Sequence, residues 1–260
     1  WLIVNFKMKS IIMAAIAGAA TARTTAEWKQ RSVYQLLTDR YNRGNGDNTI
    51  CTALNMFCGG TFKGITDNLD YIAGMGFDAI WISPICQNEY PYDYHGYGCL
   101  NWEQIMTEFG GEQALHDLVT AAHAKDIWIM LDVVANHSSY YATSNFSNIT
   151  PFNQSSYYHP FCDINWNDQW SVENCWLSGL PDHDQSVPYV RNYLVNWVTD
   201  VVSTYNIDGI RIDTVPEVPK DFWSQYGPAS GVFQMGECFN GDSAYVAQYQ
   251  GPLTALFNYP

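Results

Sequence analysis

The regular alternation of short apolar segments with amphipathic ones limits the folds open to this chain more than any other feature of its sequence. Residues 79–82 and 127–134 are apolar runs of strand length, whereas residues 115–122 carry apolar side chains at helical spacing. Strands that are apolar on both faces and alternate with helices indicate a parallel sheet covered by helices. We expect strands at 33–37, 79–82, 127–134, 208–212, 232–236 and 253–257, and helices around 65–73, 115–122 and 187–202.

Two parallel architectures fit this alternation, a doubly wound sheet and a (β/α)8 barrel. No glycine-rich phosphate loop opens the first helix, which argues against a doubly wound dinucleotide-binding sheet. Polar side chains instead follow successive strands, where barrel enzymes carry their chemistry: Asp132, Asn136, His137, Arg211, Asp213 and Glu237. We therefore expect an α/β fold, an incomplete (β/α)8 TIM barrel with about six of its eight strands.

Residues 137–184 interrupt the alternation. This segment is rich in Asn, Ser, Tyr and Trp, lacks helical periodicity and holds glycosylation sequons at Asn145, Asn148 and Asn153. Because long structureless loops are uncommon in compact domains, we expect a small inserted subdomain after the third strand. The expected organisation is upstream residues and a signal peptide (1–22), the first part of the barrel (23–136), the insertion (137–184) and the continuing barrel (185–260).

The first 22 residues have the features of a signal peptide. A lysine at position 9 precedes an apolar run at 11–20 that is too short to span a bilayer, and Ala-Thr-Ala at 20–22 is a small-residue cleavage pattern. We therefore expect a secreted protein that is not anchored in a membrane. The formal net charge of −14 argues against a nucleic-acid partner.

Secretion allows disulfide bonds among the seven cysteines. The pairs Cys51 with Cys58 and Cys162 with Cys175 are close in sequence and are the expected bridges. Buried free thiols are the alternative. An odd number of cysteines leaves at least one without a partner in the chain.

Two carboxylic acids at the ends of neighbouring strands are the candidate catalytic groups. Arg211 and Asp213 lie two residues apart on a strand, so they point the same way, and the guanidinium favours an ionised Asp213. Glu237 follows the next apolar strand, where partial shielding would raise its pKa and suit a proton donor. Carboxyls about 5–5.5 Å apart would form a retaining glycosidase pair. The alternatives are a structural Arg–Asp pair and an acid at a helix N-terminus.

Three oxygen-bearing residues border the insertion: Asn136, Glu173 and Asp182. Hard oxygen donors without Cys/His ligand spacing suit Ca²⁺ rather than Zn²⁺. The alternative is that each residue is solvated or caps a turn. His95 and His137 follow strands, and isolated histidines of this kind are usually structural or merely exposed.

Taken together, several motifs resemble the α-amylase family of glycoside hydrolases (family 13), and most closely its fungal, Taka-amylase-like members. Four of them lie at 132–137 (Asp-Val-Val-Ala-Asn-His), 180–182 (Leu-Pro-Asp), 209–213 (Gly-Ile-Arg-Ile-Asp) and 236–237 (Gly-Glu). Further fungal-like motifs lie at 34–40, 76–84, 94–97, 220–223 and 258–260. The resemblance runs from about residue 28 to the end of the chain.

The resemblance implies a role for each candidate residue. Asp213 would be the nucleophile and Glu237 the acid/base, while Arg211 orients Asp213 and Asp132 braces Arg211. Sugar contacts would come from His95, His137 and Tyr97. Calcium ligands would be Asn136, Glu173, Asp182 and the Glu217 carbonyl, and both expected disulfides look like family bridges, Cys51–Cys58 and Cys162–Cys175.

The sequence also departs from the family pattern. Gly98 stands where a Trp usually follows Tyr-His-Gly-Tyr, which removes a stacking surface, and Pro216-Glu217 replaces the usual Lys-His on the leaving-group side. Cys86, Cys99 and Cys238 are unexpected; a Cys86–Cys99 bridge would close the loop that carries His95. The third catalytic Asp of the family, the remaining strands and a C-terminal β domain are expected beyond residue 260.

We expect the full-length protein to be a secreted, monomeric α-amylase that hydrolyses internal α-1,4 bonds of starch, glycogen and malto-oligosaccharides with retention, and that contains Ca²⁺. The alternatives are another activity of the family, such as an α-glucosidase or a glucanotransferase, and a non-catalytic glucan-binding homologue.

Residues 1–260 alone are expected to be inactive, because an open barrel exposes unpaired strand edges and this segment lacks one acid. Starch cleavage at ordinary rates by the purified segment would contradict this expectation.

Overall fold

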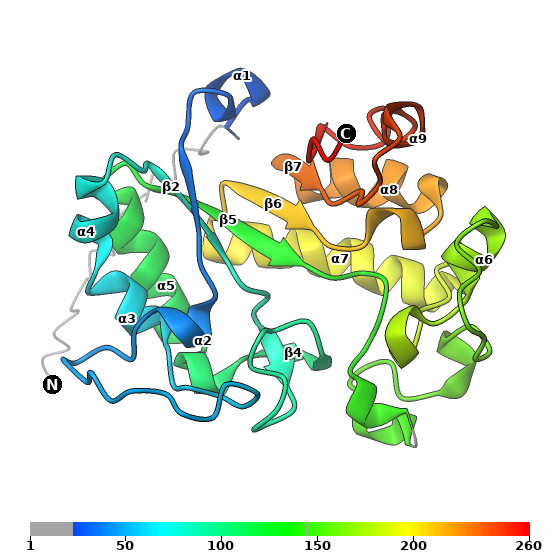
Figure 1. Ribbon diagram of the computed structural model, residues 1–260, viewed down its shortest axis with the longest axis horizontal. Coiled ribbons are helices and arrows are strands. Elements are labelled where there is room, and N and C mark those ends of the chain that lie inside the picture. The colour runs from blue at the N-terminus through cyan, green and yellow to red at the C-terminus, as the bar shows by residue number, and fades with distance from the viewer. Residues whose placement is uncertain (1–22, 144) are drawn as a thin grey trace, which may run out of the picture.

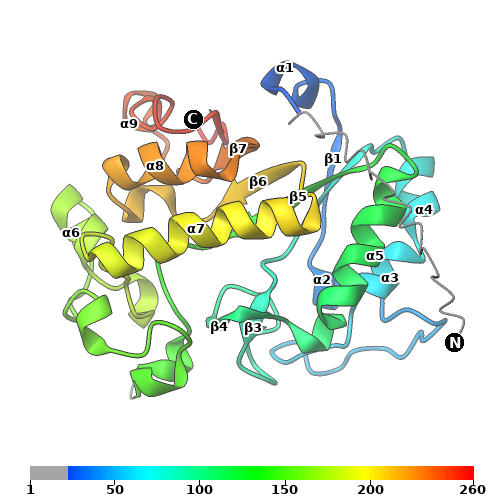
Figure 2. The ribbon, with the colours of Figure 1, turned by 180° about the vertical axis from the view of Figure 1, so that it is seen from behind.

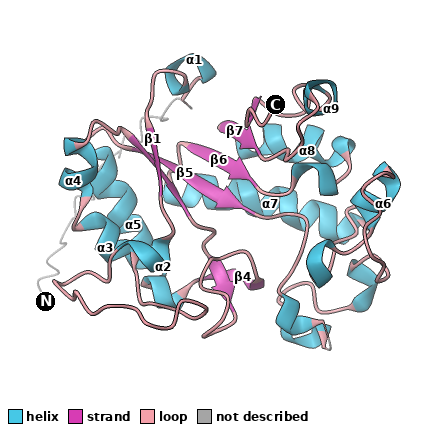
Figure 3. Ribbon diagram, viewed as in Figure 1, coloured by secondary structure: helices cyan, strands magenta, loops and turns pink. Residues whose placement is uncertain are grey.

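A single parallel sheet organises the computed structural model, which describes residues 23–143 and 145–260. The expected signal peptide lies outside the described residues. The sheet has six strands in the order β1-β2-β5-β6-β7-β8, and every neighbouring pair is parallel (Figures 1 and 3). These strands are Val33–Gln35, Ala79–Ile82, Trp128–Val133, Gly209–Ile212, Phe233–Gly236 and Ala255–Leu256.

The strand order decides between the two expected architectures. A doubly wound sheet reverses its strand order at a switch point, whereas a barrel adds each new strand beside the previous one. The six strands follow one another in sequence without reversal, apart from the separate β3–β4 hairpin. The fold is therefore an incomplete (β/α)8 barrel, as the sequence predicted.

Alternating side chains place two hydrophobic clusters on the two faces of the sheet. Ile80, Ile129 and Ile210 belong to the large cluster beneath the helices. Their strand neighbours Ala79, Trp128 and Met130 point to the other face, where they form a smaller cluster with Trp28 and Phe233. The longest helices, α5 (Gly111–His123) and α7 (Pro188–Tyr205), bury apolar stripes against the sheet and cross its outer face in Figure 2.

The remaining helices are short. They are α1 (Thr25–Trp28), α2 (Thr38–Tyr41), α3 (Phe62–Thr66), α4 (Leu69–Gly74), α6 (Gln169–Asn174), α8 (Lys220–Ser230) and α9 (Ser243–Ala247). The single helix expected around 65–73 is therefore two helices. The break is at Asn68, whose side-chain amide donates to the Gly64 carbonyl at 2.8 Å and so competes with the helical ladder.

Two segments after strands build the surroundings of the site. After β2, strands β3 (Cys86–Asn88) and β4 (Cys99–Ile105) form an antiparallel hairpin that the sequence analysis did not anticipate. After β5, residues 137–184 contain α6 and several 3₁₀ turns, and isolated bridges link His137 to Asp182 and Tyr158 to His183. In Figure 1 this segment lies to one side of the sheet.

Three disulfides fasten these loops. The predicted bridges Cys51–Cys58 and Cys162–Cys175 are present, and Cys86–Cys99 closes the loop between β3 and β4. Cys238 is a buried free thiol. Among the described residues, no helix combines the length and apolar character needed to cross a membrane.

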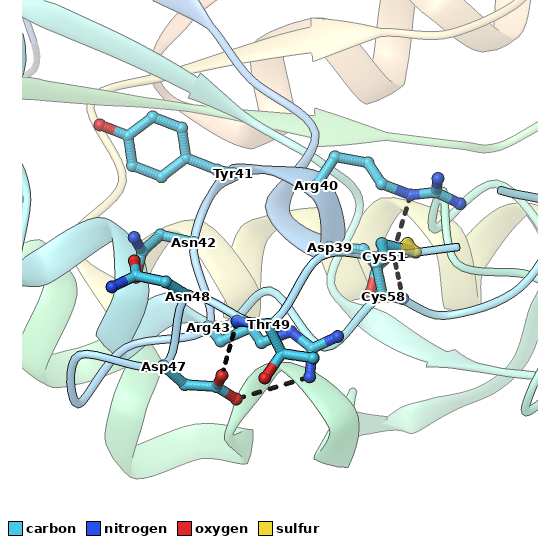
Figure 4. Close-up of a pocket in the computed structure, with 10 residues that line it drawn as sticks. All are labelled: Asp39, Arg40, Tyr41, Asn42, Arg43, Asp47, Asn48, Thr49, Cys51 and Cys58. Atoms are coloured by element: carbon cyan, nitrogen blue, oxygen red, sulfur yellow. Dashed lines mark hydrogen bonds and ion pairs between the residues drawn. A yellow bond between two sulfur atoms is a disulfide. The ribbon is translucent and has the colours of Figure 1, made fainter. Parts of the chain in front are cut away.

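A pocket of ≈ 210 Å³ lies beside the Cys51–Cys58 bridge (Figure 4). The buried Asp39 carboxylate accepts from the backbone amides of Cys58 and Gly59 and from Arg40 Nε, at 2.8–2.9 Å. Arg40 also donates to the carbonyls of Leu54 and Met56. Because these polar groups hold the 42–60 loop in place, this pocket is a structural feature rather than a reaction centre.

Candidate active site

Strand register brings the predicted acids together at the carboxyl ends of β5, β6 and β7. Asp132 on β5 is the register partner of Arg211 on β6, and Ile212 is the partner of Gly236 on β7. The residues that follow, Asp213 and Glu237, are therefore adjacent, and the Glu237 amide donates to the Ile212 carbonyl at 2.8 Å. The barrel thus positions both acids through backbone pairing.

One guanidinium joins all three carboxylates. Arg211 Nη1 donates to Asp213 Oδ1 at 2.7 Å and to Asp132 Oδ1 at 2.9 Å. Arg211 Nη2 lies 2.8 Å from Glu237 Oε2. Arg211 is 4% exposed and Asp132 is fully buried, so these pairs lie largely outside solvent. This geometry holds Asp213 and Glu237 in fixed positions relative to each other.

The surroundings at this site raise the pKa of both Arg211 and Glu237. Burial disfavours the charged form of Arg211, but the attraction of Asp132 and Asp213 outweighs burial and raises its pKa above the usual value. Burial also raises the pKa of Glu237; Arg211 opposes that rise, and the negative charge of Asp213 adds to it. The raised pKa of Glu237 suits this carboxyl to carry a proton.

Asp132 braces Arg211 from beneath. Its Oδ2 accepts from the Tyr97 hydroxyl at 2.7 Å and from Trp81 Nε1 at 2.9 Å, in addition to the guanidinium. The sequence analysis did not identify Trp81, although its position on β2 places it on the same face of the sheet. Burial raises the pKa of Asp132, and the Arg211 guanidinium and the Tyr97 hydroxyl oppose that rise.

Thr214 is a second residue that the sequence analysis missed. Its backbone adopts the left-handed conformation (φ 49°), and its amide donates to Glu237 Oε2 at 3.1 Å. A non-glycine residue in this conformation is uncommon and concentrates at functional sites. No sequence signal marks such a threonine.

The two predicted sugar-binding histidines differ in their surroundings. The Tyr97 backbone contacts both: its amide donates to His95 Nδ1 at 3.0 Å, and its carbonyl lies 3.0 Å from His137 Nε2. His137 is 2% exposed, and Asn136 lies 3.2 Å from its Nδ1, so both ring nitrogens have protein partners. The His95 side chain is 37% exposed, and its Nε2 lies 3.8 Å from Asp93 Oδ1.

Three predicted calcium ligands converge. The Asn136 amide lies 2.8 Å from Asp182 Oδ1 and 2.9 Å from the Glu217 carbonyl oxygen. Burial lowers the pKa of His137 to about 4, so its ring is neutral, and because Nε2 faces the Tyr97 carbonyl, Nδ1 carries no proton. The NH2 group of Asn136 must then donate to Nδ1. The side-chain oxygen of Asn136 then faces Asp182 Oδ1 and the Glu217 carbonyl oxygen, and a cation bound among these three oxygens would stabilise them.

Glu173 occupies a different position from these three. It lies on α6, and its carboxylate accepts from Gln169 Nε2 at 2.7 Å. Within the described residues no cluster of three or more His, Cys, Asp or Glu side chains could hold a metal. The converging set thus consists of one carboxylate, one amide and one carbonyl, so its chemistry fits Ca²⁺.

The profile of the α-amylase catalytic domain matches residues 35–250. The chain belongs to the α-amylase family. It is 40% identical over 249 residues to α-amylase 1 of Schwanniomyces occidentalis, which covers 90% of this chain and 49% of that protein. It is 38% identical to the α-amylase of Saccharomycopsis fibuligera, covering 97% of this chain and 56% of that protein.

Solved α-amylase structures share the fold. The α-amylase from Malbranchea cinnamomea superposes with a TM-score of 0.87 at 41% identity, covering 92% of this chain and 53% of that one. The Geobacillus thermoleovorans α-amylase complexed with acarbose gives 0.81 at 35% identity, over 90% and 52%. The chain spans about half the length of the curated relatives that it matches.

Proposed function

We propose that the full-length protein is an α-amylase that hydrolyses internal α-1,4-glucosidic bonds of starch, glycogen and malto-oligosaccharides with retention. The observation that carries the proposal is the single guanidinium of Arg211, which holds Asp213 and Glu237 side by side at the ends of β6 and β7. Two adjacent carboxyls, of which Glu237 has a raised pKa, are what a retaining glycosidase requires.

In the proposed reaction, Asp213 is the nucleophile and Glu237 the acid/base. Arg211 holds Asp213 Oδ1, so Oδ2 attacks the anomeric carbon while Glu237 donates its proton to the departing glycosidic oxygen. The result is a glycosyl ester on Asp213 and a free sugar chain. Glu237, now ionised, takes a proton from water, whose oxygen displaces Asp213 from the same carbon. Two displacements restore the original configuration.

Sugar binding is assigned to residues around this pair. The His95 side chain is partly exposed and its ring stacks on Tyr97, so we assign both to the sugar at the cleavage point. His137 would have to exchange its Tyr97 contact to reach that sugar. A pocket of ≈ 300 Å³ beside Glu217, on the assigned leaving-group side, is lined in part by Trp166, Phe239 and Tyr245. Aromatic rings of this kind stack on sugar faces.

We assign Asn136, Asp182 and the Glu217 carbonyl as Ca²⁺ ligands, with Glu173 as a ligand that must turn from Gln169 to take part. Bound Ca²⁺ would neutralise the facing oxygens and tie residues 137–184, the proposed subdomain, to the loop after β6. The disulfides fit the proposal of a secreted protein, because such bonds persist in oxidising compartments.

Calcium removal tests this assignment. EGTA is expected to destabilise the full-length protein by about 4 kcal/mol relative to Ca²⁺ at a thousandfold excess over Kd, because the ion binds only the folded state. The thermal unfolding midpoint measures the effect. In Asn136→Ala the difference should disappear, whereas Asn192→Ala, an exposed change on α7, should retain it. An unchanged midpoint in the parent protein would contradict the assignment.

Product analysis on soluble starch tests the proposed function. An internal-cleaving enzyme lowers viscosity before much reducing sugar appears, whereas an α-glucosidase releases glucose from the start and a glucanotransferase makes rearranged or cyclic products. Starch binding without cleavage, unaffected by Asp213→Asn, would instead support the non-catalytic alternative. Gly98 and Pro216-Glu217 differ from the usual residues of the family, and these differences are the reason for considering the non-catalytic alternative.

A further inference from the structure

Position 98 has no room for a side chain because a carboxylate fills the space. A Cβ at Gly98 would lie 2.0 Å from Asp93 Oδ2 and 2.6 Å from Asp93 Cγ, far inside contact distance. The Gly98 backbone cannot move aside easily, since its amide donates to the buried Asn88 Oδ1 at 2.7 Å. The Asp93 carboxylate can therefore occupy this place only because residue 98 is a glycine.

Asp93 is anchored to the loop after β5. Its Oδ2 accepts from the buried Ser139 hydroxyl at 2.8 Å, and Asp93 itself is 8% exposed. Ser139 is further fixed by a hydrogen bond from its amide to the Cys99 carbonyl. Burial raises the pKa of Asp93 to about 6, so the side chain is mainly an anion at neutral pH.

The other carboxylate oxygen faces His95. Because His95 Nδ1 accepts from the Tyr97 amide, the proton of the neutral ring lies on Nε2. Nε2 is 3.8 Å from Asp93 Oδ1, too far for a direct hydrogen bond, and the His95 side chain is 37% exposed. The Tyr97 amide therefore fixes the tautomer, and the Asp93 carboxylate attracts the Nε2–H edge of the ring across 3.8 Å without a hydrogen bond, so Nε2–H can donate to another acceptor.

We propose that Asp93 is a positioning residue: its carboxylate occupies the space left by Gly98 and holds the His95 ring so that Nε2–H donates to a hydroxyl of the sugar at the cleavage point. This inference rests on the proposed function, which makes that sugar the ligand of His95. Asp93 acts through His95.

Kinetics of the full-length protein on malto-oligosaccharides test the proposal. Asp93→Asn keeps the shape but removes the charge, so KM should rise about three- to tenfold, the worth of one hydrogen bond, with kcat little changed. Gly98→Ala forces the carboxylate away and should raise KM similarly. Asp93→Ala/Gly98→Ala should be no worse than Asp93→Ala alone, since the two changes act on one contact.

Controls separate positioning from folding. Gly74→Ala adds a methyl group where nothing lies within 4 Å, and Asp117→Asn removes an exposed charge on α5; neither should change KM. A purely structural role for Asp93 would lower the folded fraction, and hence apparent kcat, while leaving KM unchanged. ¹⁵N relaxation of the histidine rings provides a second measurement: in Asp93→Asn the His95 ring should become more mobile, while the Tyr97 amide keeps the proton on Nε2.

The outcomes distinguish the two proposals. If the parent protein cleaves starch but KM and the mobility of the His95 ring are unaltered in Asp93→Asn and Gly98→Ala, the inference about Asp93 is wrong and the proposed function stands. If the parent protein does not cleave starch, the proposed function fails; the mobility of the His95 ring then still decides whether Asp93 orients His95.

Discussion

Replacing Asp213 with Asn is expected to lower kcat on starch by about 10⁴-fold or more in the full-length protein, because the amide cannot form the glycosyl ester. The Arg211 contact to Oδ1 should survive, since the side-chain oxygen is retained, so the folded structure should change little. Initial rates of reducing-sugar release measure the loss. Asp221→Asn, an exposed partner of Arg191, provides the matched control and should keep parent activity.

Glu237→Gln should separate the two roles. Loss of the acid is expected to lower kcat about 10²- to 10⁴-fold on starch. The loss should be much smaller for formation of the intermediate from α-glycosyl fluorides, whose leaving group needs no proton. Equal losses on both substrates would contradict the assignment of Glu237 as the proton donor.

Replacing Arg211 with Met is expected to destabilise the protein by about 3–5 kcal/mol, because it leaves the fully buried Asp132 without its cation. Activity should fall as well, since Asp213 and Glu237 lose their common anchor. Denaturant unfolding gives the stability change. Arg211→Lys keeps the charge but not the fork that reaches several carboxylates at once, so it should recover only part of the loss.

The matched control for this change is Arg43→Met. Arg43 pairs with Asp47 at 3.4 Å on the surface, and such pairs contribute about 1 kcal/mol or less. Equal stability of Arg211→Met and Arg43→Met would show that the buried ion pairs do not hold the site together.

The barrel strands could be predicted from the sequence because their signal is local. A strand buried on both faces must be apolar along its length, so residues 79–82 and 127–134 indicated β2 and β5 within one or two residues. The β3–β4 hairpin carries Asn, Gln and Glu, its pairing register is shifted twice, and a disulfide links its strands, so no apolar run marks it. A disulfide and an irregular strand register do not change the spacing of apolar residues, so the sequence pattern does not reveal them.

The acids of the site could be predicted for the same reason. Alternation along β6 puts Arg211 and Asp213 on one face, and strand order places Glu237 next to them. The positions of loop side chains could not be predicted. The contact of His137 with the Tyr97 carbonyl, and the Asp93 carboxylate in the space at Gly98, depend on loops far apart in sequence.

The measurement that tests the central claim most directly is the mass of the protein after reaction with a slow-turnover α-maltosyl fluoride analogue. Formation of a covalent intermediate predicts an added glycosyl mass, carried after proteolysis by the peptide that contains Asp213. The same label should be absent from Asp213→Asn. Label on another residue, or rapid starch hydrolysis by Asp213→Asn, would contradict the account.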